Sequence, residues 1–599
     1  MTAKGKLFLT ILILAFAGFG IWNWKDKIFP APVAAVPSLT KEDLQQAPTG
    51  PSTKSAEEAS KFLLAGEKEA KIVTAAAIPA VAGVSSYNKS EKNGKLVVQF
   101  PINVWPGWAP IIMANNGLAA NDESYFYKQY GFYVELSVVD DPIQARDLFA
   151  SGHSHILWGT LDMIALFAPG LSKDSRSAPR VVMQVDFSDG GDGIVARNGI
   201  RSINDLRPVN GVKRKGVLAQ YSPSHFFIMS MLVDAGVNPA DIDWVWSSDA
   251  PSAAKIFVTD DSFDFFVGWA PDIYTVPEQL PSANLIVTTE TANHRVADVF
   301  AVRNDFAKDH PDVIANLIRG IFKGMDMVRA NPQGAAEALN AAFDIPVADC
   351  LGMIGSDGGI IAGDAHLTNY RENETFFLKP TSSYSFEVIW NMASRIYQKL
   401  GAIQTIVPAS SVKESKFLAD MAEEYKDVVD LSVRAFNPNQ DFSKISLEDD
   451  GVLTKAVTFN FKPNSKTLDP EYDTNAPVNI QSLGELIGGF GAAYIIIEGN
   501  ADASKKGQIP GDLVRQFTLD RAMAVKDALI KKFNLNPDQL QVKGNGWENS
   551  APLQILTDKD GTGYVVDDTG AILKGADIVT YQNRLNRRVE VKVYPIEGE

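Results

Sequence analysis

Short apolar runs alternate with amphipathic segments along the chain between residues 95 and 405. The runs expected to form strands are residues 96–102, 133–139, 155–158, 181–185, 193–196 and 263–267, and the segments expected to form helices are residues 109–118, 143–150 and 224–235. Alternation of this kind is typical of α/β domains, in which helices cover both faces of parallel sheets. A body of this length usually divides into two lobes with a ligand cleft at the carboxyl ends of the strands. The pattern therefore predicts a two-lobed α/β domain over residues 95–405.

A second, smaller α/β pattern fills the C-terminal part of the chain, residues 453–599. Alternating faces predict strands, and longer amphipathic segments predict two helices between them. The expected strands are residues 455–461, 494–499, 541–543 and 589–594, and the expected helices are residues 478–490 and 513–533. The order of elements is therefore β-α-β-α-β.

The N-terminus carries an uncharged, mostly apolar run over residues 7–24, with lysines on both sides. Eighteen residues in a helix extend about 27 Å, which is just enough to cross the core of a bilayer. We therefore expect residues 1–28 to form a transmembrane helix that anchors the protein. A cleaved signal peptide is the alternative, because Ala15-Phe16-Ala17 has the pattern of a cleavage site. Both interpretations predict that the rest of the chain is exported.

Two polar segments separate these units. Residues 29–94 are rich in Ala, Pro, Ser, Lys and Glu and have few aromatic residues, which favours a spacer. Residues 406–452 are polar and helix-prone, and are expected to connect the two folded units.

Composition narrows the class of function. The formal net charge of −16 argues against a nucleic-acid partner, which normally requires a basic surface. The only cysteine, Cys350, excludes an intramolecular disulfide and a lipid anchor on an N-terminal cysteine. No His-Glu-x-x-His helix is present, so we expect no metal site and no cofactor.

Polar and aromatic residues at the expected strand ends are the candidates for a ligand site. Trp105 and Trp108 flank a Pro-Gly turn after the first strand. Ser222 precedes a proline at the start of a helix, where free N–H groups can hold an anion. Several aspartates near strand–helix junctions favour a cationic ligand instead, so the charge of the solute stays open. The complete set of predicted ligand-binding residues is Trp105, Trp108, Thr160, Asp162, Asp186, Ser222, Ser224, His225 and Trp269.

The order of motifs in the two-lobed region resembles that of a known family. The motifs are Trp-Pro-Gly-Trp-Ala-Pro at 105–110, Tyr-Gly-Phe-Tyr-Val-Glu-Leu at 130–136, Ala-Arg-Asp-Leu-Phe-Ala-Ser-Gly at 145–152, Trp-Gly-Thr-Leu-Asp at 158–162, Pro-Ser-His at 223–225 and Arg-Asn-Asp-Phe at 303–306. Together they resemble periplasmic solute-binding proteins of the nitrate, sulfonate and thiamine-precursor type. The resemblance implies capture of a small molecule between two lobes and an ABC importer permease as a partner.

Catalysis is not expected. Some relatives of this fold make the thiamine pyrimidine with a protein histidine and iron, and His225 has a suitable position. No cysteine-rich motif accompanies it, and the region contains neither a Gly-x-Ser-x-Gly elbow nor a phosphate-binding Walker loop. We therefore predict a binding protein and not an enzyme.

The C-terminal region resembles the OmpA-like peptidoglycan-binding domain. Five blocks occur in the order of that family: Phe-Asn-Phe at 459–461 with Asn464 and Ser465, then residues 498–502, 519–522, 544–548 and 586–590. The resemblance implies binding to the diaminopimelate branch of the wall peptide. Asp502 would pair with its ammonium group, and Arg521 and Arg587 would face its carboxylates. The predicted peptidoglycan-binding residues are Asn464, Asp502, Arg521 and Arg587.

Two residues depart from the pattern of that family. Ala501 stands where the family usually has threonine, and Val514 where it often has asparagine. Fewer polar partners in this site predict weaker binding to the wall.

The hypothesis from the sequence is a bacterial periplasmic protein anchored in the inner membrane by its N-terminal helix. It would capture a solute in one domain and bind peptidoglycan with the other. The alternative is a structural envelope or assembly protein whose two-lobed domain no longer binds a solute.

Overall fold

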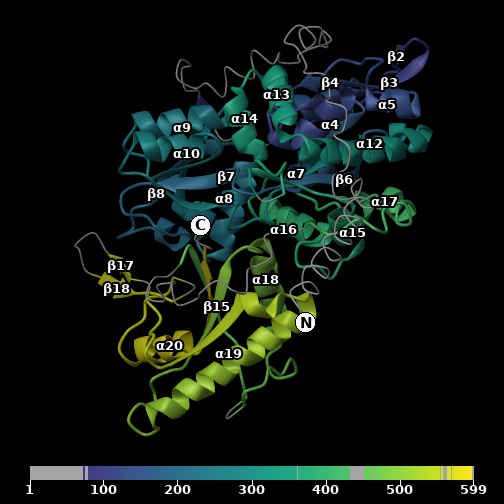
Figure 1. Cartoon of the computed structure of the whole chain (residues 1–599). Coiled ribbons are helices and arrows are strands. Elements are labelled where there is room, and N and C mark those ends of the chain that lie inside the picture. The colour runs from purple at the N-terminus through teal and green to yellow at the C-terminus, as the bar shows by residue number, and fades with distance from the viewer. Residues whose placement is uncertain are drawn as a thin grey trace, which may run out of the picture.

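The computed structural model describes residues 72–73, 78–81, 83–360, 362–431, 451–462, 465–553, 555–557, 563–567 and 570–595 (Figure 1). The predicted anchor at 1–28 and most of the predicted linker lie outside the described residues. Within the described part of the chain, no helix is both long and apolar enough to cross a membrane.

The first lobe is built on two neighbouring sheets. Their strand orders are β2-β3-β4 and β13-β6-β12-β5. The strands are β2 (Glu91–Lys92), β3 (Lys95–Ile102), β4 (Tyr133–Val138), β5 (Ile156–Thr160), β6 (Pro179–Ser188), β12 (Ala297–Arg303) and β13 (Ala365–Leu367). The backbone N–H of His155 donates to the carbonyl of Gln99, 3.1 Å away, so β3 and β5 lie next to each other. The predicted strands of this lobe are all present.

Helices cover these sheets. They are α4 (Ala109–Asn115), α5 (Tyr125–Tyr130), α6 (Pro142–Ala150), α7 (Leu161–Leu171), α11 (Asn304–Asp309), α12 (Pro311–Ala330), α13 (Pro332–Phe343), α14 (Val347–Ile354), α15 (Tyr370–Leu378), α16 (Phe386–Lys399) and α17 (Lys416–Asp420). Local sequence fixes several of their first turns. Asp141 caps α6 and Asn331 caps α13, each followed by a proline at the first helical position, where no N–H is needed.

The second lobe has one sheet with the order β1-β9-β8-β10-β7-β11. Its strands are β1 (Ile72–Val73), β7 (Asp192–Ala196), β8 (Arg214–Ala219), β9 (Ile242–Ser247), β10 (Phe265–Trp269) and β11 (Asn284–Thr288). Its helices are α8 (Pro223–Asp234), α9 (Ala250–Thr259) and α10 (Asp272–Gln279).

The sequence pattern predicted parallel sheets, but the sheets of both lobes contain parallel and antiparallel strands. Strand β8 runs parallel to β9 and β10, and β3 runs parallel to β4. Strands β7 and β12 run antiparallel to their neighbours. The reason is that each of them enters its sheet from the other lobe, so it starts at the edge where the parallel strands end.

Two chain segments cross between the lobes, residues 188–192 and 288–297. Thr289 joins them, because its hydroxyl oxygen accepts hydrogen bonds from the backbone N–H groups of Gly190 and Asp192, both at 3.0 Å. The same hydroxyl lies 2.9 Å from the hydroxyl of Ser188. The two crossings are therefore held together at one point, which is the natural place for a hinge.

The end of the predicted linker packs on the first lobe. The ring of Tyr87 contacts the rings of Phe306 and His155, and the guanidinium of Arg303 donates to the carbonyl of Ser85 at 2.7 Å. The start of the predicted connector also packs there, with the carbonyl of Val412 accepting a hydrogen bond from β6. Parts of both segments predicted to be tethers therefore lie against the first lobe.

The C-terminal domain contains the predicted β-α-β-α-β order and a third helix. Its sheet has the order β14-β19-β15-β16. The elements are β14 (Leu453–Val457), α18 (Ala476–Gly489), β15 (Tyr494–Asn500), α19 (Gly511–Phe533), β16 (Leu540–Gly546), α20 (Ala576–Asn586) and β19 (Val589–Tyr594), with a small hairpin of β17 (Ile555–Thr557) and β18 (Gly563–Val565). The first strand ends four residues before its predicted end, and the backbone of Asn460 is bound by the carboxylate of Asp473 instead.

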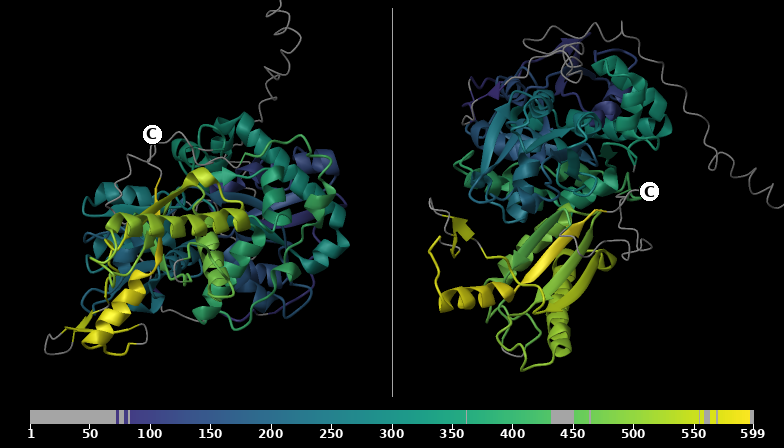
Figure 2. Two further views of the ribbon diagram at one scale, coloured as in Figure 1. Left: turned by 90° about the horizontal axis from the view of Figure 1, so that it is seen from below. Right: turned by 90° about the vertical axis from the view of Figure 1, so that its left-hand side faces the viewer.

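This domain lies beneath the two lobes and touches both of them (Figure 2). Asn204 of the second lobe donates from its side chain to the carbonyl of Thr454 at 2.9 Å and accepts from its backbone N–H at 2.7 Å. Arg395 on α16 of the first lobe pairs with Glu485 on α18 at 2.6 Å.

The centre of this junction is a buried arginine, Arg295, two residues before β12. Its guanidinium contacts the carboxylate of Asp234 on α8 at 2.5 Å and the carbonyl of Leu486 on α18 at 3.0 Å. Lys455 on β14 approaches the same carboxylate at 3.5 Å. Gly489 provides the space, since a Cβ there would lie 2.0 Å from Nε of Arg295.

Candidate functional site

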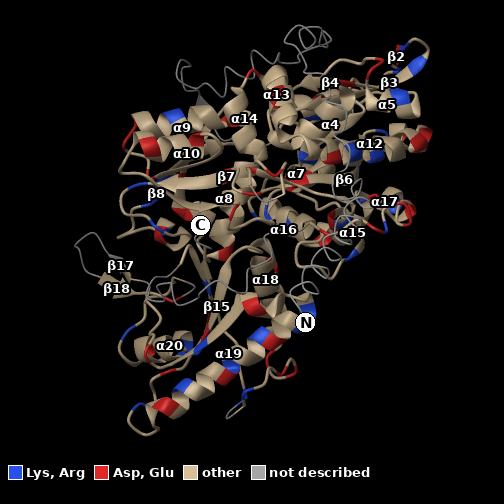
Figure 3. Ribbon diagram, viewed as in Figure 1, with Lys and Arg blue, Asp and Glu red and all other residues tan. Residues whose placement is uncertain are grey.

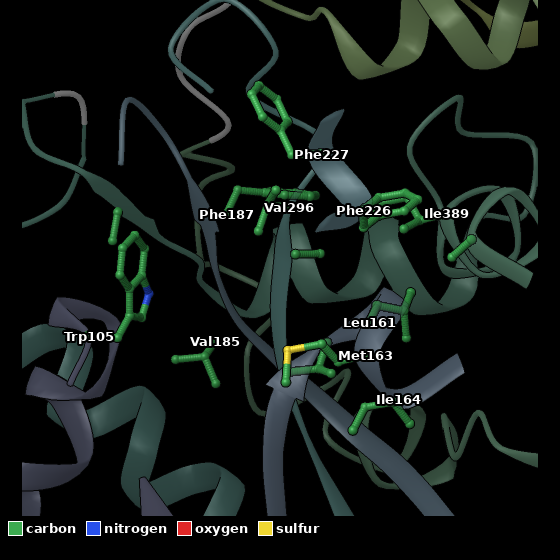
Figure 4. Packing of buried hydrophobic residues seen from close by; sticks show 14 of the residues in the cluster. Trp105, Leu161, Met163, Ile164, Val185, Phe187, Phe226, Phe227, Val296 and Ile389 are labelled. Carbon is green, nitrogen blue, oxygen red and sulfur yellow. The ribbon is translucent and has the colours of Figure 1, made fainter. Parts of the chain in front are cut away.

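A cavity of about 550 Å³ lies between the two lobes. This volume is in the range that holds a small organic molecule. The first lobe contributes nine residues to the lining: Asn103, Val104, Trp105, Asp140, Asp141, Pro142, Ile143, Trp158 and Met163. The second lobe contributes ten: Ala219, Gln220, Tyr221, Ser222, Pro223, Ser247, Ser248, Asp249, Pro251 and Trp269. The crossings and the start of β12 contribute Asp192, Val296 and Asp298. Figure 4 shows Trp105, Met163 and Val296 among the buried apolar residues of this region.

The turn after β3 forms one wall. Trp105 has an extended backbone, and its indole N–H donates to the carboxylate of Asp186 at 3.2 Å. Gly107 allows this approach, because a Cβ there would lie 1.8 Å from a carboxylate oxygen of Asp186. The Pro-Gly turn therefore allows Trp105 to bind the buried carboxylate of Asp186.

The opposite wall comes from the loops after β8, β9 and β10. Tyr221 has a φ of +63°, a left-handed conformation that is unfavourable for a residue with a side chain. Ser222 follows it, and its hydroxyl donates to the carbonyl of Ala219 at 2.7 Å and so does not cap α8. Trp269 is half-buried at the end of β10. These residues face the first lobe across the cavity.

Buried carboxyl groups lie at the base of the cavity. Asp192 and Asp298 line it and are 3% and 6% exposed. Asp186 lies behind Trp105 and is completely buried. Oδ1 of Asp192 has no hydrogen-bond partner among the described residues. Among the residues that the structure describes, no Lys, Arg or His side chain lines the cavity.

Burial shifts the titration of these acids. It raises the pKa of Asp186 and of Asp192 to about 7, because water that would solvate the charged form is excluded. The pKa of Asp298 is raised well above its usual value, by burial first and by the neighbouring charges of Asp186 and Asp192 second. Near neutral pH the group holds protons that a ligand can displace.

Two other acids at the cavity cap helices. Oδ1 of Asp141 accepts hydrogen bonds from the N–H groups of Ile143 and Gln144 at the start of α6. Oδ1 of Asp249 accepts from Ser252 at the start of α9, at 2.8 Å. Each carboxylate lies at a helix N-terminus and binds backbone N–H groups that have no partner within the helix.

The structure brings only part of the predicted ligand set to the cavity. Trp105, Ser222 and Trp269 line it. The remaining six residues are buried behind its wall and do not line it: Trp108, Thr160, Asp162, Asp186, Ser224 and His225.

These six residues have packing or hydrogen-bonding surroundings of their own. The indole N–H of Trp108 donates to Asn103 at 2.7 Å, and Asp162 accepts from the hydroxyl of Tyr397 at 3.0 Å. The ring of His225 packs against the rings of Trp246 and Tyr397, and burial lowers its pKa to about 4. A neutral, enclosed imidazole is not placed to contact a solute in this cavity.

Seven prominent lining residues are not in the predicted ligand set: Asn103, Asp140, Trp158, Asp192, Tyr221, Asp249 and Asp298. Three of them, Asp192, Asp249 and Asp298, belong to the aspartates near predicted strand–helix junctions that favour a cationic ligand. Asn103, Asp140 and Tyr221 follow the end of a strand closely, which was the available signal for them.

No metal centre is formed by the described residues, since no group of three or more His, Cys, Asp or Glu side chains is arranged to hold a metal ion. Cys350 is buried, and burial raises the pKa of its thiol to about 12. A thiol in this state is a poor nucleophile at neutral pH.

The C-terminal domain has a separate charged cluster. Nε of Arg587 lies 3.6 Å from the carboxylate of Asp502, which follows β15. Arg521 on α19 stacks over the rings of Phe461 and Phe517, and burial lowers its pKa to about 10. Asn464 lies outside the described residues. Three of the four residues predicted to bind peptidoglycan therefore lie in one region.

Comparison with known proteins found no match among curated proteins. Among solved structures, the chain is similar to a putative periplasmic sulfonate-binding protein SsuA from Methylobacillus flagellatus KT, with 17% identity and a TM-score of 0.42 over 55% of this chain and 95% of that one. It is similar to the periplasmic nitrate-binding protein NrtA from Synechocystis PCC 6803, with 15% identity and a TM-score of 0.42 over 55% and 88%. It is also similar to the desulfurization enzyme DSZB, with 13% identity and a TM-score of 0.36 over 55% and 99%.

Likenesses this distant assign neither a solute nor an activity to the chain. The family comparison is limited to part of the two-lobed region: residues 116–335, from the end of α4 into α13, match the family described as NMT1/THI5 like.

Proposed function

We propose that the protein binds a small-molecule solute in the cavity between its two lobes. The observation that carries the proposal is the cavity itself, lined by strand ends of both lobes at the point where the chain crosses between them. Open α/β sheets bind ligands at this edge. The match of residues 116–335 to the NMT1/THI5 like family and the names of the similar binding proteins are in accord with it.

Closure of the lobes would form the complete site. Trp105 belongs to the first lobe and Trp269 to the second, so a solute that touches both favours the closed arrangement. The crossings joined at Thr289 would absorb the rotation. No proton or group transfer is required of any residue.

A thermal-shift screen of the full chain tests this proposal. The solutes are sulfonates, nitrate, phosphate, amines and pyrimidines, and one class is expected to raise the melting temperature. Trp269→Ala should abolish the shift, whereas Trp244→Ala, which removes a half-buried tryptophan outside the cavity, should keep it. Absence of any shift in the folded wild-type protein would favour the alternative of a structural envelope or assembly role.

We further propose that the C-terminal domain binds the diaminopimelate peptide of peptidoglycan. The support is the proximity of Asp502, Arg521 and Arg587, which together offer one carboxylate for an ammonium and two guanidinium groups for carboxylates. The stacking of Arg521 on two phenylalanine rings fixes its position before a ligand arrives.

Sedimentation with purified peptidoglycan tests the second proposal. Binding of the full chain should be lost in Asp502→Ala and in Arg521→Ala. Arg515→Ala is the matched control, because it removes an exposed arginine from the same helix that pairs with Asp512 and Glu548 instead. Figure 3 shows that acidic and basic residues are interspersed along α19, so the charge of the helix as a whole does not distinguish these two arginines. Undiminished binding in both test variants would refute the assignment.

The envelope setting completes the proposal. Residues 1–28 would anchor the protein in the inner membrane or direct its export, and a permease of an ABC importer would receive the solute. Membrane fractionation tests the anchor by comparing the full chain with a chain that lacks residues 1–28. If residues 1–28 are a membrane anchor, only the shortened chain is recovered in the soluble fraction.

A further inference from the structure

We infer that the solute of the interlobe cavity is a small organic cation, an ammonium group carried on an organic scaffold that also offers a hydrogen-bond acceptor. This inference rests on the proposed function and names the class of its solute.

The charges around the cavity have one sign. Its acidic lining residues are Asp140, Asp141, Asp192, Asp249 and Asp298, and none of its described lining residues is basic. A cation entering the cavity would be attracted by every ionised carboxylate and would favour ionisation of the protonated ones, whereas an anion would meet no opposite charge among the described lining residues. Electrostatic complementarity of this kind selects the class of ligand.

One buried acid is incompletely paired. Asp192 is 3% exposed, it lines the cavity, and its Oδ1 has no hydrogen-bond partner in the described part of the chain. An unpaired oxygen in a buried carboxylate is unfavourable unless a ligand supplies the missing donor. An ammonium group supplies both the donor and the opposite charge.

The acids that surround Asp192 reinforce this preference. Asp162, Asp186 and Asp298 interact with one another or with Asp192 through their charges. The charges of Asp189 and Asp192 also act on Asp364, which lies in a neighbouring loop. The positive charge that acts on Asp186 is that of His366, which is itself paired with Glu372 at 2.5 Å. The base of the cavity thus retains an excess of acid.

Three described α-helices have an N-cap residue in the cavity lining, and two of them are already capped by carboxylates. Asp141 occupies the start of α6 and Asp249 the start of α9, where each accepts backbone hydrogen bonds. An anionic solute would have to displace these carboxylates. The third, α8, has no side-chain cap at Ser222, and its start faces the same acidic residues.

Aromatic side chains favour an organic cation over a bare ion. Trp105, Trp158, Tyr221 and Trp269 line the cavity. The indole N–H of Trp105 is bound to Asp186, so its π surface is what it can offer a solute. Cations bind to such surfaces, most strongly to tryptophan. The indole N–H of Trp158 is buried and has no partner among the described residues, which provides the donor for an acceptor on the scaffold.

Calorimetric titration of the full chain tests the inference with defined probes. The cations are ethanolamine and 4-amino-1-butanol, each with an ammonium N–H donor and a hydroxyl acceptor. The neutral control is 1-pentanol, which has nearly the shape of 4-amino-1-butanol without its charge, and the anions are ethanesulfonate and nitrate. We expect one of the two amino alcohols to bind at least about tenfold more tightly than the neutral and anionic probes.

Two variants locate the binding. Asp192→Asn should weaken binding of the cation by at least about tenfold. Asp189→Asn, which changes an equally buried acid three residues earlier that does not line the cavity, should weaken it by less than about threefold. Melting curves of both variants show whether they are folded.

The outcomes separate this inference from the proposed function. Tight binding of an anion or of the neutral alcohol, lost in Trp269→Ala, would overturn the cationic class and leave solute binding intact. Equal binding of the cation by wild type and Asp192→Asn would place it elsewhere and overturn the inference. If no cation binds, the inference is wrong, and the broader thermal-shift screen then decides whether solute binding fails as well.

Discussion

At the scale of single residues, the interlobe cavity is built around carboxyl groups that lack basic partners. Asp186, Asp192 and Asp298 form no ion pair with Lys or Arg in the described part of the chain, although each is almost completely buried. An isolated charge is unfavourable in a buried position, so such a carboxyl group stays protonated unless a ligand supplies a positive charge or a hydrogen-bond donor. Their raised pKa values express the same fact.

These pKa values predict how stability depends on pH without a ligand. The folded protein keeps protons on Asp186 and Asp192 up to about pH 7, whereas the unfolded chain releases them near pH 4. The folded state therefore binds more protons in this window, and its stability falls as the pH rises from about 4 to above 7. Asp192→Asn removes one such group and should raise the free energy of unfolding at pH 8 by about 1–3 kcal/mol, with little effect at pH 4.

Urea unfolding at pH 4 and pH 8 measures this effect. Asp243→Asn is the control, because Asp243 is exposed on β9 and should leave both values within about 0.5 kcal/mol of wild type. A variant Asp192→Asn that is less stable than wild type at pH 8 would show that the ionised carboxylate is stabilised by its surroundings.

The sequence located the cavity better than it located the contacting side chains. Trp105 and Trp269 were predictable, because large aromatic residues directly after a strand reach the carboxyl edge of the sheet. Ser222 and Ser224 were both predicted to bind the ligand, but only Ser222, the residue before the helix, lines the cavity, and Ser224 is buried in α8. Tyr221 precedes them with a left-handed backbone. No local pattern signals a left-handed tyrosine.

At the scale of elements, β12, α8 and α18 meet at Arg295. The pair of Arg295 and Asp234 is buried, so removing one partner leaves an uncompensated charge. Arg295→Met should lower the free energy of unfolding by about 3–5 kcal/mol. Pairing of Lys455 with Asp234 would make this loss smaller. The double variant Arg295→Met, Asp234→Leu should lose less than the sum of the two single variants.

A double-mutant cycle by urea unfolding measures the coupling. Additive losses would mean that Arg295 and Asp234 act independently. Arg395→Ala is the control, since its pair with Glu485 is half-exposed and should contribute only about 0–1 kcal/mol.

A glycine in α18 provides a second test of this junction. Gly489 lies under the guanidinium of Arg295, which is held by Asp234 and Leu486 and cannot turn away freely. Gly489→Ala should therefore destabilise the protein by about 1–3 kcal/mol, although alanine is the better helix former. Gly352→Ala in α14, where a Cβ would have open space, should be neutral or slightly stabilising in the same thermal unfolding measurement. Equal effects of the two substitutions would contradict the packing at Gly489.

Most elements were predictable from periodicity, and their bounds agree to within a few residues. Strands 96–102 and 133–139 correspond to β3 and β4, and helix 513–533 lies within α19. The pattern gave no sign of the antiparallel direction of β7 and β12, because strand direction depends on which lobe the chain comes from and not on local composition.

At the scale of the whole molecule, three units form one assembly. The two lobes share the cavity, and the C-terminal domain contacts the second lobe through Asn204 and the first through Arg395. The order of the units along the chain followed from composition and motifs. Their docking did not, because the residues that make it, such as Asp234, Arg295 and Leu486, come from segments far apart in the sequence and have no shared local signal.

The central claim is that a solute binds between the lobes and contacts both of them. Hydrogen–deuterium exchange of the full chain, with and without the solute that gives the largest thermal shift, tests it most directly. We predict simultaneous protection of the loop after β3, at residues 103–108, and of the loops after β8 and β9, at residues 220–223 and 248–249, because these segments carry the two walls of the cavity. Protection confined to one lobe, or found only in the C-terminal domain, would contradict the claim.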